Sequence, residues 1–342
     1  GLAAQRASLR GSEVFARGGG QIIQPAEIPE EPFAPRPLRT GVLAVVLGLM
    51  LGVGLAFLRD FMDDAVRSDE QARRATGQPV LGHIPRWKEA SAQESRLVTL
   101  VQPASPVSEA YKTLRTNVRF MTAGRASRSV LVTSPLAGEG KTTTAANLAV
   151  ALARTQTRVL LVGSDLRKPT IHRLFGIESR PGLSEVLIGD VEIADVVTDV
   201  GVPNLRVIPG GTVPPNPAEL LSSAAMHSLM TDLEHIADMV IYDGPPVMPV
   251  ADALEIGPRV GATILVIDTG TTGRHALRAA TQRLEDVGVN LTGVILNRID
   301  PDDAYYGYDY YAAYMADGAE TEPPPSRPTR RWGPTDDDMA VE

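Results

Sequence analysis

Cysteine is absent from this 342-residue sequence, which excludes disulfides and thiolate metal sites. Aromatic residues are scarce at 5%, and the five His residues show no spacing typical of metal ligands. Acidic residues outnumber basic ones, 41 to 33, giving a net charge of −8, and the sequence has no basic stripe. Nucleic acid is therefore not expected as a partner. The rest of the composition, 43% hydrophobic and 22% charged, is that of a globular protein with room for about two domains.

One long hydrophobic run, Gly41–Leu58, contains eighteen residues without a charge. That length favours a transmembrane helix; the alternative is a buried helix of a soluble domain. Arginines follow the run at positions 59, 67, 73 and 74, whereas only Arg36 and Arg39 lie close before it. By the positive-inside rule, we expect the C-terminal part in the cytoplasm and the helix in the plasma (inner) membrane.

Beyond this run, apolar strand patterns alternate with helical patterns, which predicts an α/β domain with a doubly wound, mostly parallel sheet. The expected strands are 129–133, 158–162, 205–208, 239–242, 262–267 and 291–296, and the expected helices include 141–155, 217–237 and 273–287. The predicted organisation is a Pro-rich extracytoplasmic segment (1–40), the transmembrane helix (41–58), a juxtamembrane linker (59–100) that is turn-rich at 77–85, the α/β domain (101–300), and a Tyr-rich cluster with a disordered tail (301–342). Because the sequence starts at Gly1 without Met, we expect it to be part of a longer protein.

The segment Ser134–Thr143 (SPLAGEGKTT) lies between an apolar strand pattern and a helical pattern. Strand, Gly-containing turn, Lys-Thr and helix is the order of a phosphate-binding P-loop, although Pro135 stands where the motif has its first Gly. The alternative is an ordinary Gly-rich loop before a helix. We expect the loop to bind ATP, with Lys141 on the β- and γ-phosphates and the Thr142 hydroxyl on Mg²⁺. The predicted nucleotide-binding residues of the loop are Gly138, Glu139, Gly140, Lys141, Thr142 and Thr143.

Two aspartates stand where strands of such a domain end. Asp243 closes the run Met239–Asp243, and Asp165 follows the run at 159–162. Carboxylates at these positions hold Mg²⁺ or its waters in P-loop sites, so we predict Asp165 and Asp243 as catalytic and metal-binding residues together with Lys141 and Thr142. The alternative is that each aspartate only caps a turn.

Six of the eight tyrosines lie close together near the chain end, with neither helical nor strand spacing. They are Tyr305, Tyr306, Tyr308, Tyr310, Tyr311 and Tyr314. The simpler interpretation is a stacking tail. The other interpretation is a set of phosphoacceptors that serve the triphosphate site.

In their order, these motifs resemble the bacterial tyrosine kinases of the polysaccharide co-polymerase type, over about residues 25–314. The resemblance also rests on Glu109–Arg115 (EAYKTLR), Val162–Pro169 (VGSDLRKP), Gly210–Leu221 (GGTVPPNPAELL) and Tyr242–Pro246 (YDGPP). It implies that residues 101–300 form a cytoplasmic tyrosine kinase domain that phosphorylates the Tyr cluster of a neighbouring subunit in a homo-oligomeric ring. It also implies other subunits of a polysaccharide polymerisation and export system, a tyrosine phosphatase, and a further transmembrane helix and extracytoplasmic domain before Gly1.

The resemblance assigns further roles. The interface motif Glu-x-x-Arg-x-x-Arg of the family corresponds to Glu109, Lys112 and Arg115, where Lys112 replaces an Arg and loses its bidentate geometry. Asn297 corresponds to a position that contacts adenine in related ATPases.

Gly163 departs from the family pattern, because it stands where the first Asp of an Asp-x-Asp motif is expected. Loss of that carboxylate leaves a second hypothesis open, an ATP-binding regulator with weak or no phosphotransfer. A third hypothesis, a partitioning or septum-site ATPase, is disfavoured because Leu136 replaces the signature Lys of that class.

Overall fold

The computed structural model describes residues 37–62, 64–87, 97–124 and 128–300. The described chain falls into two compact units, a helical one that ends at Met62 and a larger one that starts at Asp63. The predicted phosphoacceptor tyrosines 305–314 lie outside the described residues.

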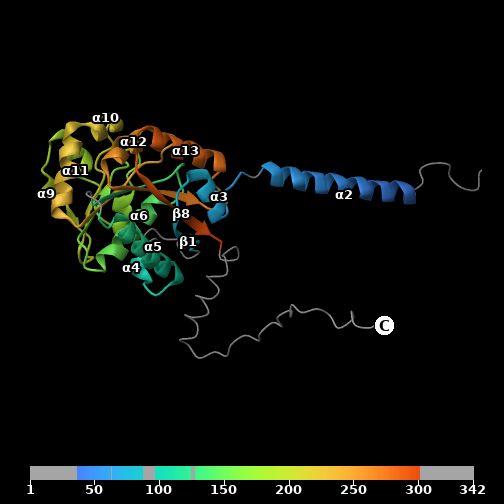
Figure 1. Ribbon diagram of the computed structural model, residues 1–342, viewed down its shortest axis with the longest axis horizontal. Helices are drawn as coiled ribbons and strands as arrows, with labels where there is room; N and C mark the ends of the chain where they lie inside the picture. The colour runs from blue at the N-terminus through green and yellow to red at the C-terminus, as the bar shows by residue number, and fades with distance from the viewer. Residues whose placement is uncertain (1–36, 63, 88–96, 125–127, 301–342) are drawn as a thin grey trace, which may run out of the picture. The chain divides into compact units, whose positions relative to one another are not determined.

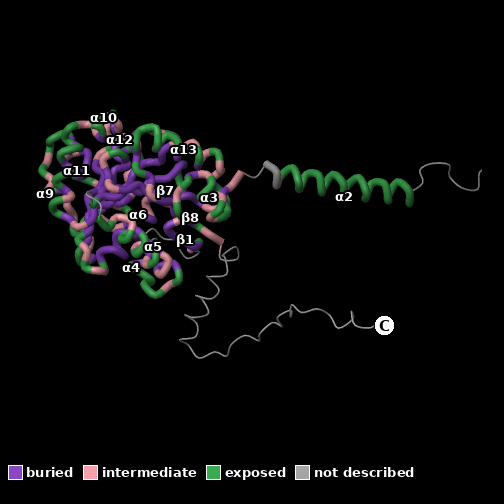
Figure 2. Tube along the Cα trace, viewed as in Figure 1, coloured by how far each residue is buried: buried purple, intermediate pink, exposed green. Residues whose placement is uncertain are grey.

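The first unit contains helix α2 (Pro37–Met62). Its stretch Leu38–Arg59 is long and apolar enough to cross a membrane, and none of its most apolar window is buried (Figure 2). By length and composition, this helix is a candidate membrane span. The helix is longer than the predicted 41–58 at both ends.

The second unit is built on an eight-stranded sheet in the order β1-β8-β7-β2-β6-β3-β5-β4. All neighbouring pairs are parallel except β4 with β5. The strands are β1 (Val80–Pro85), β2 (Ser129–Thr133), β3 (Val159–Gly163), β4 (Thr198–Asp199), β5 (Leu205–Ile208), β6 (Met239–Asp243), β7 (Ala262–Asp268) and β8 (Leu291–Ile299). The doubly wound, mostly parallel sheet predicted from the sequence is thus confirmed.

Helices cover both faces of this sheet (Figure 1). Every residue of β2, β3, β6 and β7 is buried, as expected for central parallel strands that contact helices on both sides. Alternate residues point to opposite faces: Val130 and Val132 pack with α4, α5 and α6, whereas Leu131 packs with α8, α10 and α11. The α-helices are α3 (Asp69–Thr76), α4 (Val98–Val101), α5 (Pro106–Thr122), α6 (Lys141–Ala153), α7 (Ile171–Phe175), α8 (Leu183–Ile188), α9 (Ile193–Val196), α10 (Pro217–Ser222), α11 (Ala224–Ile236), α12 (Asp252–Ile256) and α13 (Arg274–Asp286), and a short 3₁₀ turn, Gly257–Arg259, follows α12.

Two local differences from the sequence interpretation have clear causes. The expected helix 217–237 is two helices, because the Ser223 hydroxyl accepts a hydrogen bond from Met226 N and starts α11. The turn-rich stretch 77–85 contains β1, which pairs with β8, so the sheet begins inside the region interpreted as a juxtamembrane linker.

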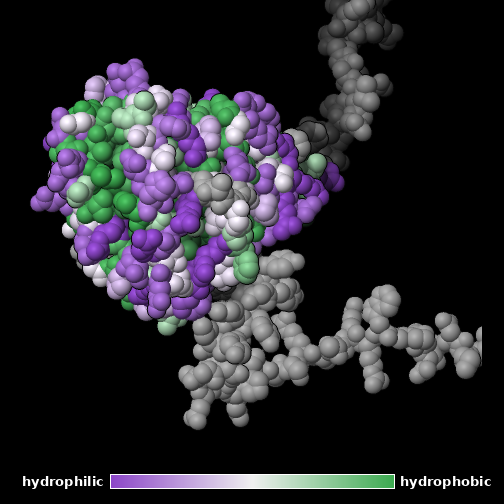
Figure 3. All heavy atoms as spheres, turned by 60° about the vertical axis from the view of Figure 1, so that its left-hand side comes forward, coloured by the Kyte–Doolittle hydropathy of each residue, from purple (hydrophilic) through white to green (hydrophobic). Residues whose placement is uncertain are grey.

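The surface of the second unit is drawn in Figure 3, where the visible face mixes hydrophilic and hydrophobic residues, as folded domains generally do.

Candidate functional site

The predicted P-loop connects the end of β2 to the start of α6 at the carboxyl edge of the sheet. Gly138 and Gly140 have φ angles of 88° and 93°, in the left-handed region that favours glycine. A Cβ on Gly140 would also come 2.2 Å from Asn297 Nδ2. The loop therefore requires glycine at position 140 for both conformation and space.

Glu139 and Asn297 hold this loop in place. The Asn297 side chain donates from Nδ2 to the Glu139 carbonyl oxygen at 2.8 Å. The buried Glu139 carboxylate accepts hydrogen bonds from Leu136 N at 2.7 Å and from the Thr272 hydroxyl. Burial raises the pKa of Glu139 to about 7, against the opposing effect of these two hydrogen bonds. Both residues were predicted as nucleotide contacts. In the structure their side chains make hydrogen bonds to the P-loop backbone and to Thr272. Thr272 was not predicted from the sequence.

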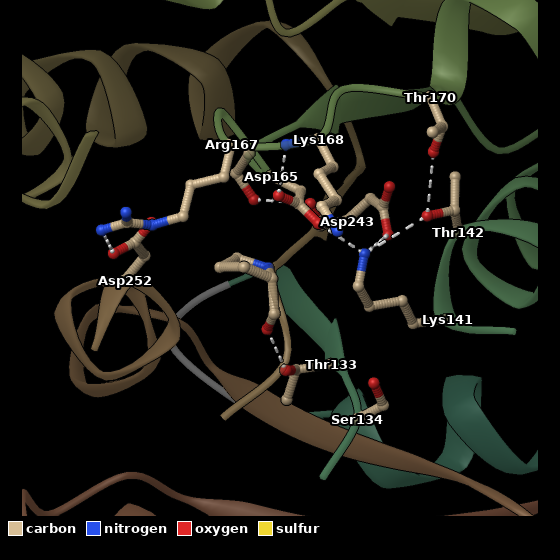
Figure 4. Close-up of polar contacts among 12 residues, drawn as sticks. Thr133, Ser134, Lys141, Thr142, Asp165, Arg167, Lys168, Thr170, Asp243 and Asp252 are labelled. Carbon is tan, nitrogen blue, oxygen red and sulfur yellow. Dashed lines mark hydrogen bonds and ion pairs between the residues drawn. The ribbon is translucent and has the colours of Figure 1, made fainter. Parts of the chain in front are cut away.

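Lys141 and the two predicted aspartates meet at the centre of the site (Figure 4). Lys141 Nζ lies 2.7 Å from Asp165 Oδ2 and 4.0 Å from Asp243 Oδ1. Burial alone would lower the pKa of Lys141, but the charges of Asp243 and Asp165 raise it above its usual value. Burial raises the pKa of Asp243 to about 6, although the Lys141 charge and Thr142 oppose that rise. Lys141 is therefore a buried cation that stays charged near neutral pH.

The alternative role of turn capping applies in part to Asp165. Its Oδ1 accepts from Lys168 N at 3.0 Å, which caps the turn after β3, while its Oδ2 faces Lys141. Asp243 caps no turn through its side chain: its backbone carbonyl accepts from Ser164 N, and its carboxylate turns toward Lys141 and Thr142.

The donor set at this centre fits Mg²⁺. Asp243 Oδ1 is buried and has no hydrogen-bond partner, so it is available as a ligand. The Thr142 hydroxyl accepts from the Thr170 hydroxyl at 3.4 Å, and carboxylate and hydroxyl oxygens are the ligands that Mg²⁺ prefers. Within the described residues, no group of three or more acidic, His or Cys side chains could hold a metal alone. A metal here would thus be shared with substrate phosphates, as is usual for Mg²⁺.

Two cavities of about 460 Å³ each meet at the P-loop. The first extends from the loop toward β3 and α7, and the second extends toward β8 and β1. Gly140, Thr143 and Arg298 line both. Because β2 lies between β7 and β6 in the sheet, the cavities occupy opposite sides of the phosphate loop.

Two arginines at these cavities were missed in the sequence interpretation. Arg167 makes a bidentate pair with the fully buried Asp252, at 2.8 and 2.9 Å (Figure 4). Arg298 donates to Asp268 at 2.6 Å and has φ of 57°, which is unusual for a residue other than glycine. Neither pair has a local sequence signal, since the partners are 85 and 30 residues apart.

Gly163 lies at the end of β3, paired with Asp243 on β6. A Cβ at this position would come 3.0 Å from Gly210 N and 3.5 Å from the Ile208 carbonyl oxygen. A side chain at position 163 therefore requires the backbone at Gly210 to move. In the described part of the loop after β3, Asp165 is the one residue whose carboxylate lies within 4.0 Å of Lys141 Nζ.

The predicted interface residues lie together on α5. Lys112 donates to Glu109, three residues earlier, and Arg115 Nη1 lies 3.5 Å from the Ala151 carbonyl oxygen of α6. The structure contains a single copy of the chain, so the role of these residues between subunits stays a prediction.

Comparison with known proteins identifies this arrangement. Residues 130–318 match the family described as "CobQ/CobB/MinD/ParA nucleotide binding domain". The chain is 40% identical over 212 residues to tyrosine-protein kinase YwqD of Bacillus subtilis, covering 62% of this chain and 90% of that protein. The chain belongs to the bacterial tyrosine-protein kinase family.

Other members of this family extend the similarity. Tyrosine-protein kinase ptk of Acinetobacter johnsonii is 32% identical over 309 residues, which cover 87% of this chain but 42% of that protein. The solved kinase domain of the Escherichia coli tyrosine kinase Etk superposes with a TM-score of 0.65 at 32% identity, covering 70% of this chain and 97% of that domain. The chain thus spans less than half the length of the longer curated relatives of the tyrosine-protein kinase family.

Proposed function

We propose that this chain is the membrane-anchored kinase part of a tyrosine autokinase that transfers the γ-phosphate of ATP to the tyrosines at 305–314 of a neighbouring copy. The observation that carries the proposal is the buried Lys141, paired with Asp165 and 4.0 Å from Asp243 at the end of the P-loop. Membership in the tyrosine-protein kinase family and the predicted acceptor cluster support the same activity.

Each side chain has a part in the proposed transfer. The loop amides of 138–142 and Lys141 hold the β- and γ-phosphates, and Lys141 turns from Asp165 to the phosphates as they bind. Thr142, Asp165 and Asp243 would hold Mg²⁺ and its waters, and the bound ion would supply positive charge that neutralises the phosphates. Asn297 holds the P-loop in place next to the proposed adenine position, through its hydrogen bond to the Glu139 carbonyl oxygen.

The acceptor tyrosine oxygen then bonds to the γ-phosphorus while the bond from that phosphorus to the β–γ bridging oxygen breaks, and ADP leaves. Asp165 lines the cavity on the side away from Asn297, so we assign it to position the hydroxyl and accept its proton.

We further propose that α2 spans the plasma membrane with the kinase domain in the cytoplasm, where ATP is present. The proposed partners are copies of this chain in a ring, with Glu109, Lys112 and Arg115 at the interface. Other subunits of an exopolysaccharide export system and a tyrosine phosphatase complete the proposed set. The apolar, exposed Leu38–Arg59 and the arginines that follow it support this location.

The test is mass spectrometry of the full chain in detergent after incubation with Mg²⁺ and ATP. We expect phosphate on peptides that contain residues 305–314, and none in Lys141→Met or in a variant with all six tail tyrosines changed to Phe. A wild-type chain that acquires no phosphate but binds ATP, measured with a fluorescent analogue, would instead indicate the regulator hypothesis raised by Gly163.

Gly163→Asp separates these two hypotheses further. Because its Cβ would crowd Gly210, the variant is expected to lose about 1–3 kcal/mol of stability, so its melting temperature must be measured first. If Gly163→Asp stays folded and gains phosphotransfer that the wild type lacks, the regulator hypothesis is correct.

A further inference from the structure

We propose that Lys168 and Arg173 make the acceptor side of the site selective for acidic tyrosine segments, and that the segment they select is Asp300–Glu322 of a second copy of this chain. The inference rests on the proposed kinase function and names the chemistry of its acceptor.

The first step is the direction from which an acceptor must come. The second cavity, toward β8 and β1, contains Asn297, Tyr111 and Trp87, and its apolar side chains suit a purine base. With the base there and the phosphates on the loop, an in-line attack on the γ-phosphorus comes from the opposite side. That side is the first cavity, toward β3 and α7.

The second step is the charge of that approach. Besides Lys141, the first cavity is lined by four basic residues, Arg167, Lys168, Arg173 and Arg298, and by one acidic residue, Asp165, which is paired with Lys141. Arg167 and Arg298 are paired with Asp252 and Asp268. Lys168 and Arg173 are exposed and make no ion pair with the described part of the chain. Their charges are thus available to an incoming chain.

Nucleotide binding alone does not require these two cations. In the proposed mechanism, Lys141 and the amides of the loop hold the phosphates, whereas Lys168 and Arg173 lie on the segment after β3 and on α7, later in the chain than Asp165. Figure 4 shows Lys168 following Asp165 and Arg167 on that segment. A cation on the side of the γ-phosphate opposite to the adenine would contact the incoming acceptor segment and not the adenine.

The third step is the charge of the acceptor. Between Asp300 and Ser326 the sequence has seven acidic residues and no Lys or Arg. Asp302, Asp303 and Asp309 lie next to or between the tyrosines, so that each acceptor tyrosine has an acidic residue within five positions. This segment therefore complements the cavity in charge.

The experiment uses the full chain with its six tail tyrosines changed to Phe, loaded with a non-hydrolysable ATP analogue and Mg²⁺. A fluorescent peptide of residues 300–316 and its Asp302, Asp303 and Asp309→Asn version are titrated by anisotropy. We expect the Asn peptide to bind about tenfold more weakly at low salt, with the difference lost near 0.5 M NaCl.

Variants locate the effect. Lys168→Ala with Arg173→Ala is expected to weaken the acidic peptide about fivefold, to leave the Asn peptide within twofold, and to leave the affinity for the ATP analogue within twofold. Arg154→Ala, which removes an exposed charge from the far end of α6, is the matched control and is expected to change neither peptide. Lys168→Glu with Arg173→Glu should bind a peptide with Lys at the three Asp positions better than the native peptide.

Equal affinity for the two peptides, or an equal loss of ATP-analogue and peptide affinity in the double Ala variant, would overturn the inference. The kinase proposal is read separately, from phosphate transfer to the same peptides with ATP. If the acidic peptide binds better than the Asn peptide but neither is phosphorylated, only the kinase proposal is contradicted. If both peptides are phosphorylated equally well and bind equally well, only this inference is contradicted.

Discussion

At the scale of single residues, the protonation of Glu139 makes the stability of the folded chain depend on pH. Its pKa is raised to about 7 by burial, so between about pH 4.5 and 7 the folded chain binds a proton that the unfolded chain has lost. The stability that this proton provides is complete below pH 4.5 and is lost as the pH rises through 7. We expect the free energy of unfolding of the nucleotide-free wild type to fall, relative to that of Glu139→Gln, by about 2 kcal/mol between pH 5 and 8, so that its melting temperature falls relative to that of the variant.

The matched control for this prediction is Glu185→Gln. Burial opposes the ionisation of Glu185, but hydrogen bonds from Thr212 and Gly182 lower its pKa to about 2, so it stays ionised over the whole range. Its difference from the wild type should be constant between pH 5 and 8 in scanning calorimetry. A wild type whose melting temperature runs parallel to that of Glu139→Gln would show that Glu139 does not titrate there.

Residues with a motif could be predicted from the sequence, and residues that act through tertiary contacts could not. Lys141, Asp165 and Asp243 converge as expected, because the ends of parallel strands meet at one edge of the sheet. Thr272 reaches Glu139 from 133 residues away, and its neighbours carry no pattern that points to the loop. The contact between Thr272 and Glu139 depends on β7 lying next to β2, and this pairing is seen only in the folded structure.

At the scale of elements, the buried central strands were predictable and the edges were not. β2 and β5 match the predicted ranges at both ends. Arg128 and Ser134 flank β2, and Asn204 and Pro209 flank β5, so each strand has residues typical of loops at its two ends. The sequence predicts turns at β1, because Gly77 and Pro79 directly precede the strand and Gly82 lies within it. Gly82 packs closely against α5, since a Cβ at this position would lie 3.1 Å from Leu114 Cδ1.

Helix α13 shows a contact between elements that carries a prediction. Its N-cap Gly273 has no capping side chain, and Asp64 supplies one from a distant segment. Asp64 Oδ2 accepts from His275 N at 3.0 Å, and Oδ1 accepts from Arg274 Nε at 3.0 Å. The hydrogen bond from His275 N is the main reason that the pKa of Asp64 is lowered. Asp64→Ala is expected to cost about 1 kcal/mol of stability.

Thermal unfolding measures this loss as a decrease of about 2–4 °C in melting temperature for a domain of this size. Asp286→Ala, at the opposite end of the same helix, is the control. An acidic residue at a helix C-terminus opposes the helix dipole, so its removal should not lower the melting temperature. Equal losses in the two variants would show that Asp64 acts through general charge and not as a cap.

At the scale of the whole molecule, the balance of charge between tail and cavity governs the proposed assembly. The chain already carries a net charge of −8. Each phosphotyrosine adds about −1.5 to −2 charges, so six of them would more than double the negative charge. Lys168 and Arg173 can balance only part of one tail, and later phosphates repel one another and the carboxylates of Asp165 and Asp243.

We therefore expect phosphorylation to release subunits from the proposed ring. The full chain in detergent would be weighed by mass photometry before incubation with Mg²⁺ and ATP, after it, and after a final treatment with a tyrosine phosphatase. The expected sequence is an oligomer, smaller species, and an oligomer again. The variant with six Phe in place of the tail tyrosines is the control, because it keeps the ATP site and should keep its mass throughout. A fully phosphorylated chain with the mass of the starting oligomer would show that tail charge does not control assembly.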